Sequence, residues 1–286
     1  FASSLEKNKE FSKVYIQLVR AGEAGGVLDE VLNRLAENME KQKEFRAKTK
    51  GAMIYPIIVT IAMVVVGFIM MIFVIPKLTE MYKDFGAQLP LPTLVLIGIS
   101  DFMVNFWYIV LGGMAAAFAV FSRWKKTPVG HLQWDSFVLK VPIFGILRQK
   151  TILTEFTRTL SLLLGSGISL LQALEIVTDG VENLVYQNAL KEATKQVEKG
   201  VSLSQSISRY ESFPPILQQM ISVGEETGKL DDVLFKLSKY FEQEAEQAVK
   251  NLTAAMEPLI MVVLGVGVGA MVIAVIMPIY NLTSQF

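Results

Sequence analysis

Two glutamates have the sequence neighbours that most strongly suggest a special role. Glu23 and Glu225 each occupy the second position of the pattern Gly-Glu-x-x-Gly-x-Leu, which occurs twice in the chain. The second glycine suits the left-handed backbone at a helix C-terminus, so each carboxylate is expected in the last turn of a helix, where the helix dipole disfavours negative charge. The charge then needs a partner from elsewhere: an ion pair or a cap on a neighbouring helix, a metal ion, or another protein. The candidate residues are Gly22, Glu23, Gly26, Leu28, Gly224, Glu225, Gly228 and Leu230.

The other reactive side chains are too few for most enzyme chemistry. His131 is the only histidine and there is no cysteine, which excludes a His-based triad, a multi-histidine metal site and a thiolate metal site. The sequence has no glycine-rich phosphate loop ending in Lys-Ser or Lys-Thr. Lys+Arg and Asp+Glu each total 27, so net charge gives no sign of nucleic-acid binding. We therefore predict a protein that is not an enzyme, with no catalytic residue, metal ligand or cofactor assigned, and we interpret His131 as an interfacial surface residue.

The glutamate motif is part of a longer internal repeat. The offset of 202 residues that relates Gly22 to Gly224 also relates other identical residues without a gap: Phe11 and Phe213, Pro56 and Pro258, and Pro76 and Pro278. Each copy is therefore a helical segment that leads directly into an apolar segment. Since Phe1 corresponds to Leu203, we expect that a complete first copy needs about 50 further residues ahead of Phe1.

Three uncharged segments are long enough to cross a membrane. They comprise residues 51–76, 102–122 and 258–286, and about 20 helical residues suffice for a hydrocarbon layer of about 30 Å. A mean hydropathy of +0.42 also exceeds what one soluble core of this size needs. The alternative for each segment is a buried helix of a large soluble protein. We predict transmembrane helices at 51–76, 102–122 and 257–280.

Basic residues beside these segments predict their orientation, because cytoplasmic flanks carry the excess of Lys and Arg. Five basic residues lie between positions 41 and 50, two lie in the loop 77–101, three lie between 123 and 126, and none follows Lys250. Most of the chain is therefore expected in the cytoplasm. The predicted parts outside the membrane are the C-terminal part of a first cytoplasmic helical domain at 1–50, a short outer loop at 77–101, a second cytoplasmic helical domain at 123–256 and an outer tail at 281–286.

Apolar residues at three- and four-residue spacing predict helices throughout the second domain. Ser169 and Ser202 open capping boxes, in which the serine hydroxyl accepts the amide three residues on. Other helix boundaries are predicted at Gly165-Ser166-Gly167, Asp179-Gly180, Asn183, Gly200 and Pro214-Pro215. The predicted fold class is an all-α membrane protein with three transmembrane helices and two cytoplasmic antiparallel helical bundles, of about six helices in the second copy and truncated at the N-terminus in the first.

The apolar segments contain small residues and prolines but no charged side chain. Charged residues in a membrane usually mark ion paths, so their absence favours assembly over transport. Gly265 and Gly269 leave room for the close approach of another helix or for ordinary packing within the chain. Pro56 and Pro258, near the cytoplasmic ends of their segments, are expected to mark a helix start or a bend at the membrane junction.

The chain resembles the PilC/GspF family of inner-membrane platform proteins, which serve type IV pilus and type II secretion machines. The resemblance covers essentially the whole chain. The matching residues are Phe156-Thr157-Arg158-Thr159-Leu160, Leu164-Gly165-Ser166-Gly167-Ile168-Ser169-Leu170, Ala173-Leu174-Glu175, Gly200-Val201-Ser202-Leu203, Pro142-Ile143-Phe144-Gly145 and the duplicated glutamate motif.

This resemblance implies a multi-pass protein of the bacterial inner membrane that forms a homo-oligomer. It implies contacts with a cytosolic hexameric assembly ATPase, with pilin or pseudopilin subunits, with other inner-membrane assembly proteins and with the lipid bilayer. Some relatives hold calcium with an acidic residue directly after the second glycine of the motif, where this chain has Val27 and Lys229. The expected function is a platform that couples the ATPase to the insertion or extraction of pilins. The alternatives are a platform for a type II secretion pseudopilus and, more remotely, a helical membrane sensor or signalling scaffold.

Overall fold

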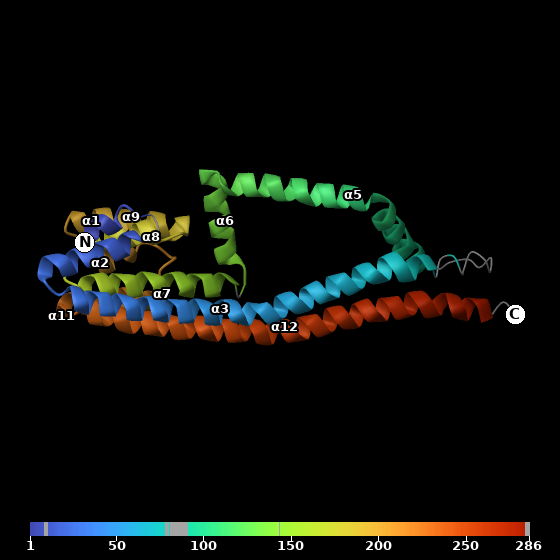
Figure 1. Cartoon of the computed structure of the whole chain (residues 1–286). Coiled ribbons are helices and arrows are strands. Elements are labelled where there is room, and N and C mark those ends of the chain that lie inside the picture. Colours follow the sequence, from blue (N-terminus) through green and yellow to red (C-terminus); the bar gives the residue numbers. More distant parts are fainter. Residues whose placement is uncertain (9–10, 78–79, 81–90, 143, 284–286) are drawn as a thin grey trace. The chain divides into compact units, whose positions relative to one another are not determined.

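The computed structural model describes residues 1–8, 11–77, 80, 91–142 and 144–283 of the chain, and these residues form helices and contain no strand (Figure 1). In chain order the helices are α1 (Ala2–Leu5), α2 (Lys13–Gly25), α3 (Leu28–Ile69), the π-helix η1 (Met70–Val74), α5 (Leu91–Lys125), α6 (Pro128–Lys140), α7 (Phe144–Gly165), α8 (Leu170–Gly180), α9 (Leu184–Glu198), α10 (Leu203–Ile207), α11 (Pro215–Thr227) and α12 (Leu230–Thr283).

Two compact units can be distinguished along this chain. The helical body comprises Phe1–Lys50 and Thr127–Leu252, and the apolar unit comprises Gly51–Lys126 and Thr253–Phe286. Helices α3 and α12 each begin in the helical body and continue into the apolar unit.

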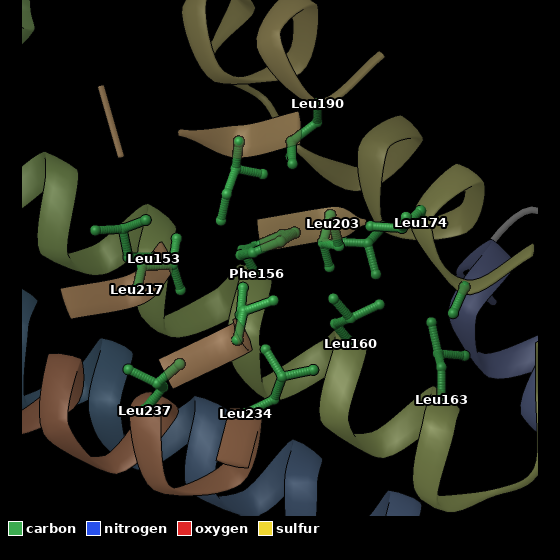
Figure 2. Packing of buried hydrophobic residues seen from close by; sticks show 14 of the residues in the cluster. Leu153, Phe156, Leu160, Leu163, Leu174, Leu190, Leu203, Leu217, Leu234 and Leu237 are labelled. Carbon is green, nitrogen blue, oxygen red and sulfur yellow. The ribbon is translucent and has the colours of Figure 1, made fainter. Parts of the chain in front are cut away.

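Helix α7 supplies the centre of the core in the helical body. Leu153, Phe156, Leu160 and Leu163 follow one another at three- and four-residue spacing and are at most 2% exposed, so one face of α7 is buried along most of its length. Figure 2 shows Phe156 and Leu160 between Leu203 and Leu174 on one side and Leu234 and Leu237 on the other. The helices on both sides of α7 are therefore joined by one continuous hydrophobic core.

A buried tyrosine extends this core toward the loop before α11. The Tyr186 ring packs edge-on against Phe213 with ring centroids 5.4 Å apart, and its Oη donates a hydrogen bond of 2.7 Å to the Ser212 carbonyl. Gln149 donates a second hydrogen bond to the same carbonyl. Burial raises the pKa of Tyr186 to about 12, so the hydroxyl keeps its proton and remains a donor.

Most helix boundaries predicted from local residue types are confirmed. Helix α7 ends at Gly165 and α8 at Gly180, and Asn183 accepts the amides of Val185 and Tyr186 as the N-cap of α9. Ser202 also caps α10, since its Oγ accepts the Gln205 amide. The cap predicted at Ser169 is wrong in one respect: Ser169 precedes α8, but its side chain makes no capping hydrogen bond. Nothing in the structure explains this difference.

Two of the described helices are long and apolar enough to cross a membrane. They contain Ile57–Lys77 and Leu230–Gly269, whose most apolar windows of 18 residues have mean hydropathies of 3.1 and 1.8. The most apolar window of the first helix is not buried at all, and only 11% of the most apolar window of the second helix is buried. A core helix of a soluble protein would be mostly buried, so these two helices do not fit that alternative.

Helix α5 contains the segment 102–122, whose membrane crossing stays a prediction. Its backbone departs from helical geometry at Phe106, with φ −120° and ψ 20°. Before this kink, Ser100 is buried and its Oγ donates a hydrogen bond of 2.5 Å to the Met71 carbonyl in η1. The wider turns of a π-helix leave carbonyl groups without their usual α-helical donors, and a neighbouring serine can satisfy such a group in an apolar environment.

The structure shows where the predicted membrane-junction and helix-packing residues lie, but it does not test the roles predicted for them. Pro56 lies within α3 and Pro258 within α12, so neither helix starts at its proline. A Cβ atom built on Gly265 or Gly269 meets no described atom within 4 Å, so the helix contact predicted for them stays a prediction. Parts of the predicted outer loop and tail, at 78–79, 81–90 and 284–286, lie outside the described residues.

The apolar unit also contains a groove between α3 and α12. Its volume is about 770 Å³, and it is lined almost entirely by apolar atoms. Ala62, Gly67 and Gly267 are among its lining residues. Their small side chains leave the space that larger residues would fill.

Candidate functional site

The Glu225 carboxylate caps the N-terminus of the preceding short helix. Oε1 accepts the Leu203 amide at 2.5 Å, and Oε2 accepts the Ser204 amide at 3.2 Å and the Ser204 hydroxyl at 2.5 Å. The first amides of a helix have no partner within that helix, and its dipole favours a negative charge at this end. Although Glu225 lies in the last turn of α11, its charge therefore faces the favourable end of α10.

Glu23 makes the equivalent contacts in the first copy of the repeat. Its Oε1 accepts the Phe1 amino group at 2.7 Å and its Oε2 accepts the Ala2 amide at 3.1 Å. Phe1 and Ala2 precede Leu203 and Ser204 by the same 202 residues that separate the two glutamates. The two copies thus share one capping geometry.

The second glycine of each motif closes the helix that carries the glutamate. Gly26 has φ +69° and Gly228 has φ +68°, which are left-handed values that other residues rarely adopt. The amides of Val27 and Lys229 donate to the carbonyls of Gly22 and Gly224, each at 3.0 Å. The chain then turns directly into α3 or α12, whose first residues are Leu28 and Leu230.

The first glycine of each motif allows two successive helices to approach closely. A Cβ on Gly224 would lie 3.0 Å from the Leu230 Cα and 3.3 Å from the Val233 Cβ. A Cβ on Gly22 would lie 3.3 Å from the Leu28 Cα and 3.0 Å from the Val31 Cβ. Since these neighbours include backbone atoms, a side chain at either glycine would force the two helices apart. We call this arrangement of Gly22–Leu28 and of Gly224–Leu230 the helix joint.

The observed contacts of the helix joint are structural ones, which cap one helix and close another. Its two carboxylates already accept backbone amides. Among the described residues, no group of three or more histidine and acidic side chains is placed to hold a metal ion. The sequence alone left an ion pair, a cap, a metal ion and a partner protein open for the glutamates. The geometry matches a cap on a neighbouring helix.

Both helix joints lie in parts of the chain that match a known protein family. A profile described as "Type II secretion system (T2SS), protein F" matches residues 1–76 and 156–278. These two stretches cover more than half of the chain, include both helix joints and end at Pro76 and Pro278, which the internal repeat also relates. The chain belongs to the protein F family.

Individual members of the protein F family match nearly the whole chain. The type IV pilus assembly protein TapC of Aeromonas hydrophila is 39% identical over 275 residues, which are 96% of this chain and 67% of TapC. The type IV pilus assembly protein PilC of Thermus thermophilus is 38% identical over 283 residues, 99% of this chain and 70% of PilC. The type II secretion system protein F of Xanthomonas campestris is 34% identical over 278 residues, 96% of this chain and 68% of its own length.

Membership of the protein F family confirms the resemblance found in the sequence. The family comprises membrane components of type II secretion and type IV pilus assembly. The apolar helices of this chain agree with that class of protein.

A buried ion pair in the helical body was not predicted from the sequence. Arg158 of α7 and Glu242 of α12 lie 2.6 Å apart, with side chains only 10% and 25% exposed. The Arg158 guanidinium also lies over the Phe45 ring of α3, 6.0 Å from its centroid. Arg158 therefore joins α7 to both long helices of this protein F family member.

Three further ion pairs, each less buried than that of Arg158 and Glu242, join the same helices. They join α3 to α7 (Arg46 and Glu155), α3 to α12 (Lys48 and Glu246) and α7 to α12 (Lys150 and Glu244). Arg158 lies on the side of α7 opposite Phe156 and Leu160, one helical turn from Thr154 and Ser161, so the apolar spacing of α7 did not mark it as buried. Its partner could not be identified without the packing of α7 on α12.

Proposed function

We propose that this protein is the inner-membrane platform of a type IV pilus-like machine, coupling a cytosolic hexameric assembly ATPase to the insertion or extraction of pilin subunits. The observation that carries this proposal is the continuity of α3 and α12. Each begins at a helix joint in the helical body and continues as one helix into the apolar unit. The chain therefore passes from the helical body into the apolar unit within α12, without an intervening loop.

The proposed topology has three transmembrane helices, with the helical body in the cytoplasm. The apolar surfaces of α3 and α12 support two of the spans, and the uncharged segment 102–122 of α5 supports the third. The excess of basic residues before position 51 and after position 122 supports the orientation. We place the protein in the bacterial inner membrane as a homo-oligomer alongside other assembly proteins.

The groove in the apolar unit is the proposed contact for the pilin. A subunit that enters or leaves a bilayer must carry an apolar segment, and its natural partner within the membrane is an apolar groove that admits close helix approach. The groove between α3 and α12 has that chemistry. An ATPase without an apolar segment would instead contact the helical body, whose surface carries most of the charged residues.

Site-specific photo-crosslinking in cells tests this division of contacts. A photoreactive residue at Val263 in the groove is expected to capture the pilin, whereas the same residue at exposed Lys191 or Val223 of the helical body is expected to capture the ATPase. Phe118 on α5 is the matched apolar control outside the groove and should capture neither protein. Capture of the ATPase from Val263, or of pilin equally from Val263 and Phe118, would contradict the proposal.

A platform for a type II secretion pseudopilus is the second candidate. It is favoured by the family profile and by the relative from Xanthomonas campestris. The pilus assembly proteins TapC and PilC share more identical residues with this chain, which supports the first candidate. The subunit captured from Val263, a pilin or a pseudopilin, distinguishes the two machines.

A further inference from the structure

Helix α6 exposes three large apolar side chains on one face. Val129, Leu132 and Phe137 are 66%, 40% and 60% exposed. Their spacing of three and five residues places them on one side of the helix, together with the partly exposed Ser136 and the exposed Gln133 and Lys140. Phe144 and Ile146, at the start of α7, are also exposed. No described residue covers this face, which we call the α6 face.

The opposite side of α6 is firmly attached to the helical body. Asp135 accepts the Leu184 amide at 2.8 Å and thereby caps α9, while Leu139 packs against the core. A Cβ atom on Gly145 would overlap the Leu139 carbonyl, so α6 and α7 meet with no room for a side chain. The α6 face therefore cannot turn inward without breaking these contacts.

We infer that the α6 face lies in the surface of the membrane, with its apolar side chains among the lipids at the cytoplasmic boundary. This inference rests on the proposed placement of α5 across the membrane. Helix α5 ends at Lys125 and α6 begins at Pro128. Three residues of chain reach at most about 11 Å, which places the start of α6 near the polar layer of the bilayer.

The composition of this region matches a lipid surface better than a protein partner. Arg123, Lys125 and Lys126 directly precede α6 in sequence, and Lys140 ends it, so positive charge is available for anionic lipids. Trp134 lies next to Phe137, with ring centroids 6.0 Å apart, and aromatic rings of this kind are enriched at membrane interfaces. With 13 residues, α6 is too short to span a bilayer but long enough to lie in its surface.

Nitroxide labels on the full chain in nanodiscs of phosphatidylcholine and phosphatidylglycerol test the inference. Since the chain contains no cysteine, Val129→Cys, Leu132→Cys and Phe137→Cys each provide one labelling position on the surface. Each label is expected to collide with oxygen, which dissolves in lipid, more often than with a water-soluble nickel chelate. A label at exposed Gln219→Cys on α11 should show the reverse preference.

A label at Phe118→Cys on α5 separates this inference from the proposed topology. If Phe118 reports lipid and the three α6 labels report water, the inference is overturned and the topology stands. If Phe118 reports water, both fail. Labels on α6 that collide with neither reagent also overturn the inference, and spin–spin broadening that disappears on dilution with unlabelled protein would identify a second copy of the chain as the covering partner.

Discussion

Replacing Glu225 with alanine is expected to release α10 and to abolish pilus or pseudopilus assembly while the protein still inserts into the membrane. The substitution removes three hydrogen bonds to a charged acceptor, those from the Leu203 amide, the Ser204 amide and the Ser204 hydroxyl. Hydrogen bonds to charged groups contribute about 1.5–3 kcal/mol each and are not additive, so we expect a loss of about 3 kcal/mol of local stability. This corresponds to about a hundredfold faster amide hydrogen exchange across α10.

Glu226→Ala is the matched control, because the two glutamates are adjacent and differ in their contacts. Glu226 is exposed and accepts one hydrogen bond from Ser222, on its own helix. Its replacement should leave both the exchange at α10 and the assembly of filaments unchanged. Unchanged exchange in the Glu225→Ala protein, or normal filament assembly by it, would contradict the capping role.

Replacing Arg158 with methionine is expected to lower the free energy of unfolding of the helical body by about 3 kcal/mol. The methionine retains most of the apolar contacts of the arginine stem, but it leaves the Glu242 carboxylate without its partner in a mostly buried position. Removing one member of a buried ion pair usually costs more than the pair itself contributes. The double variant Arg158→Met/Glu242→Gln should therefore recover part of the lost stability, measured by chemical denaturation.

The exposed pair of Lys48 and Glu246 is the control for this experiment. It joins two of the same helices, but its side chains are accessible to water, and exposed pairs contribute little. Lys48→Met should leave the midpoint of unfolding unchanged. An equal loss in Lys48→Met and Arg158→Met, or no recovery in the double variant, would show that Arg158 does not act through Glu242.

The sequence predicted the parts of this fold that depend on local residue types. Helix ends at Gly165, Gly180, Asn183 and Pro215 could be located because glycine, proline and capping side chains act within a few residues along the chain. The all-helical class and two apolar helices followed from spacing and hydropathy, which are also local properties. The repeat predicted that Glu23 and Glu225 share one environment, although not what that environment is.

Contacts between distant residues could not be predicted in the same way. The partner of Glu225 is a pair of amides about 22 residues earlier, and every helix offers such amides. The close approach at Gly224 depends on the direction in which α12 leaves the joint. The pairing of Arg158 with Glu242 depends on how α7 packs against α12, 84 residues away in sequence. In each case the partner is determined by tertiary packing.

Labelling of single cysteines from the two sides of the membrane locates the helical body directly. We propose that this water-exposed body lies on the cytoplasmic side and is joined to helices that cross the bilayer. A cysteine at Gln243, exposed on α12 within the helical body, should react with a membrane-impermeant maleimide only after the cytoplasmic side is opened. Gln88 lies in the predicted outer loop, outside the described residues. A cysteine there should react in whole cells from which the outer membrane has been removed, with the inner membrane still closed. Reaction of both cysteines from the same side would contradict this topology.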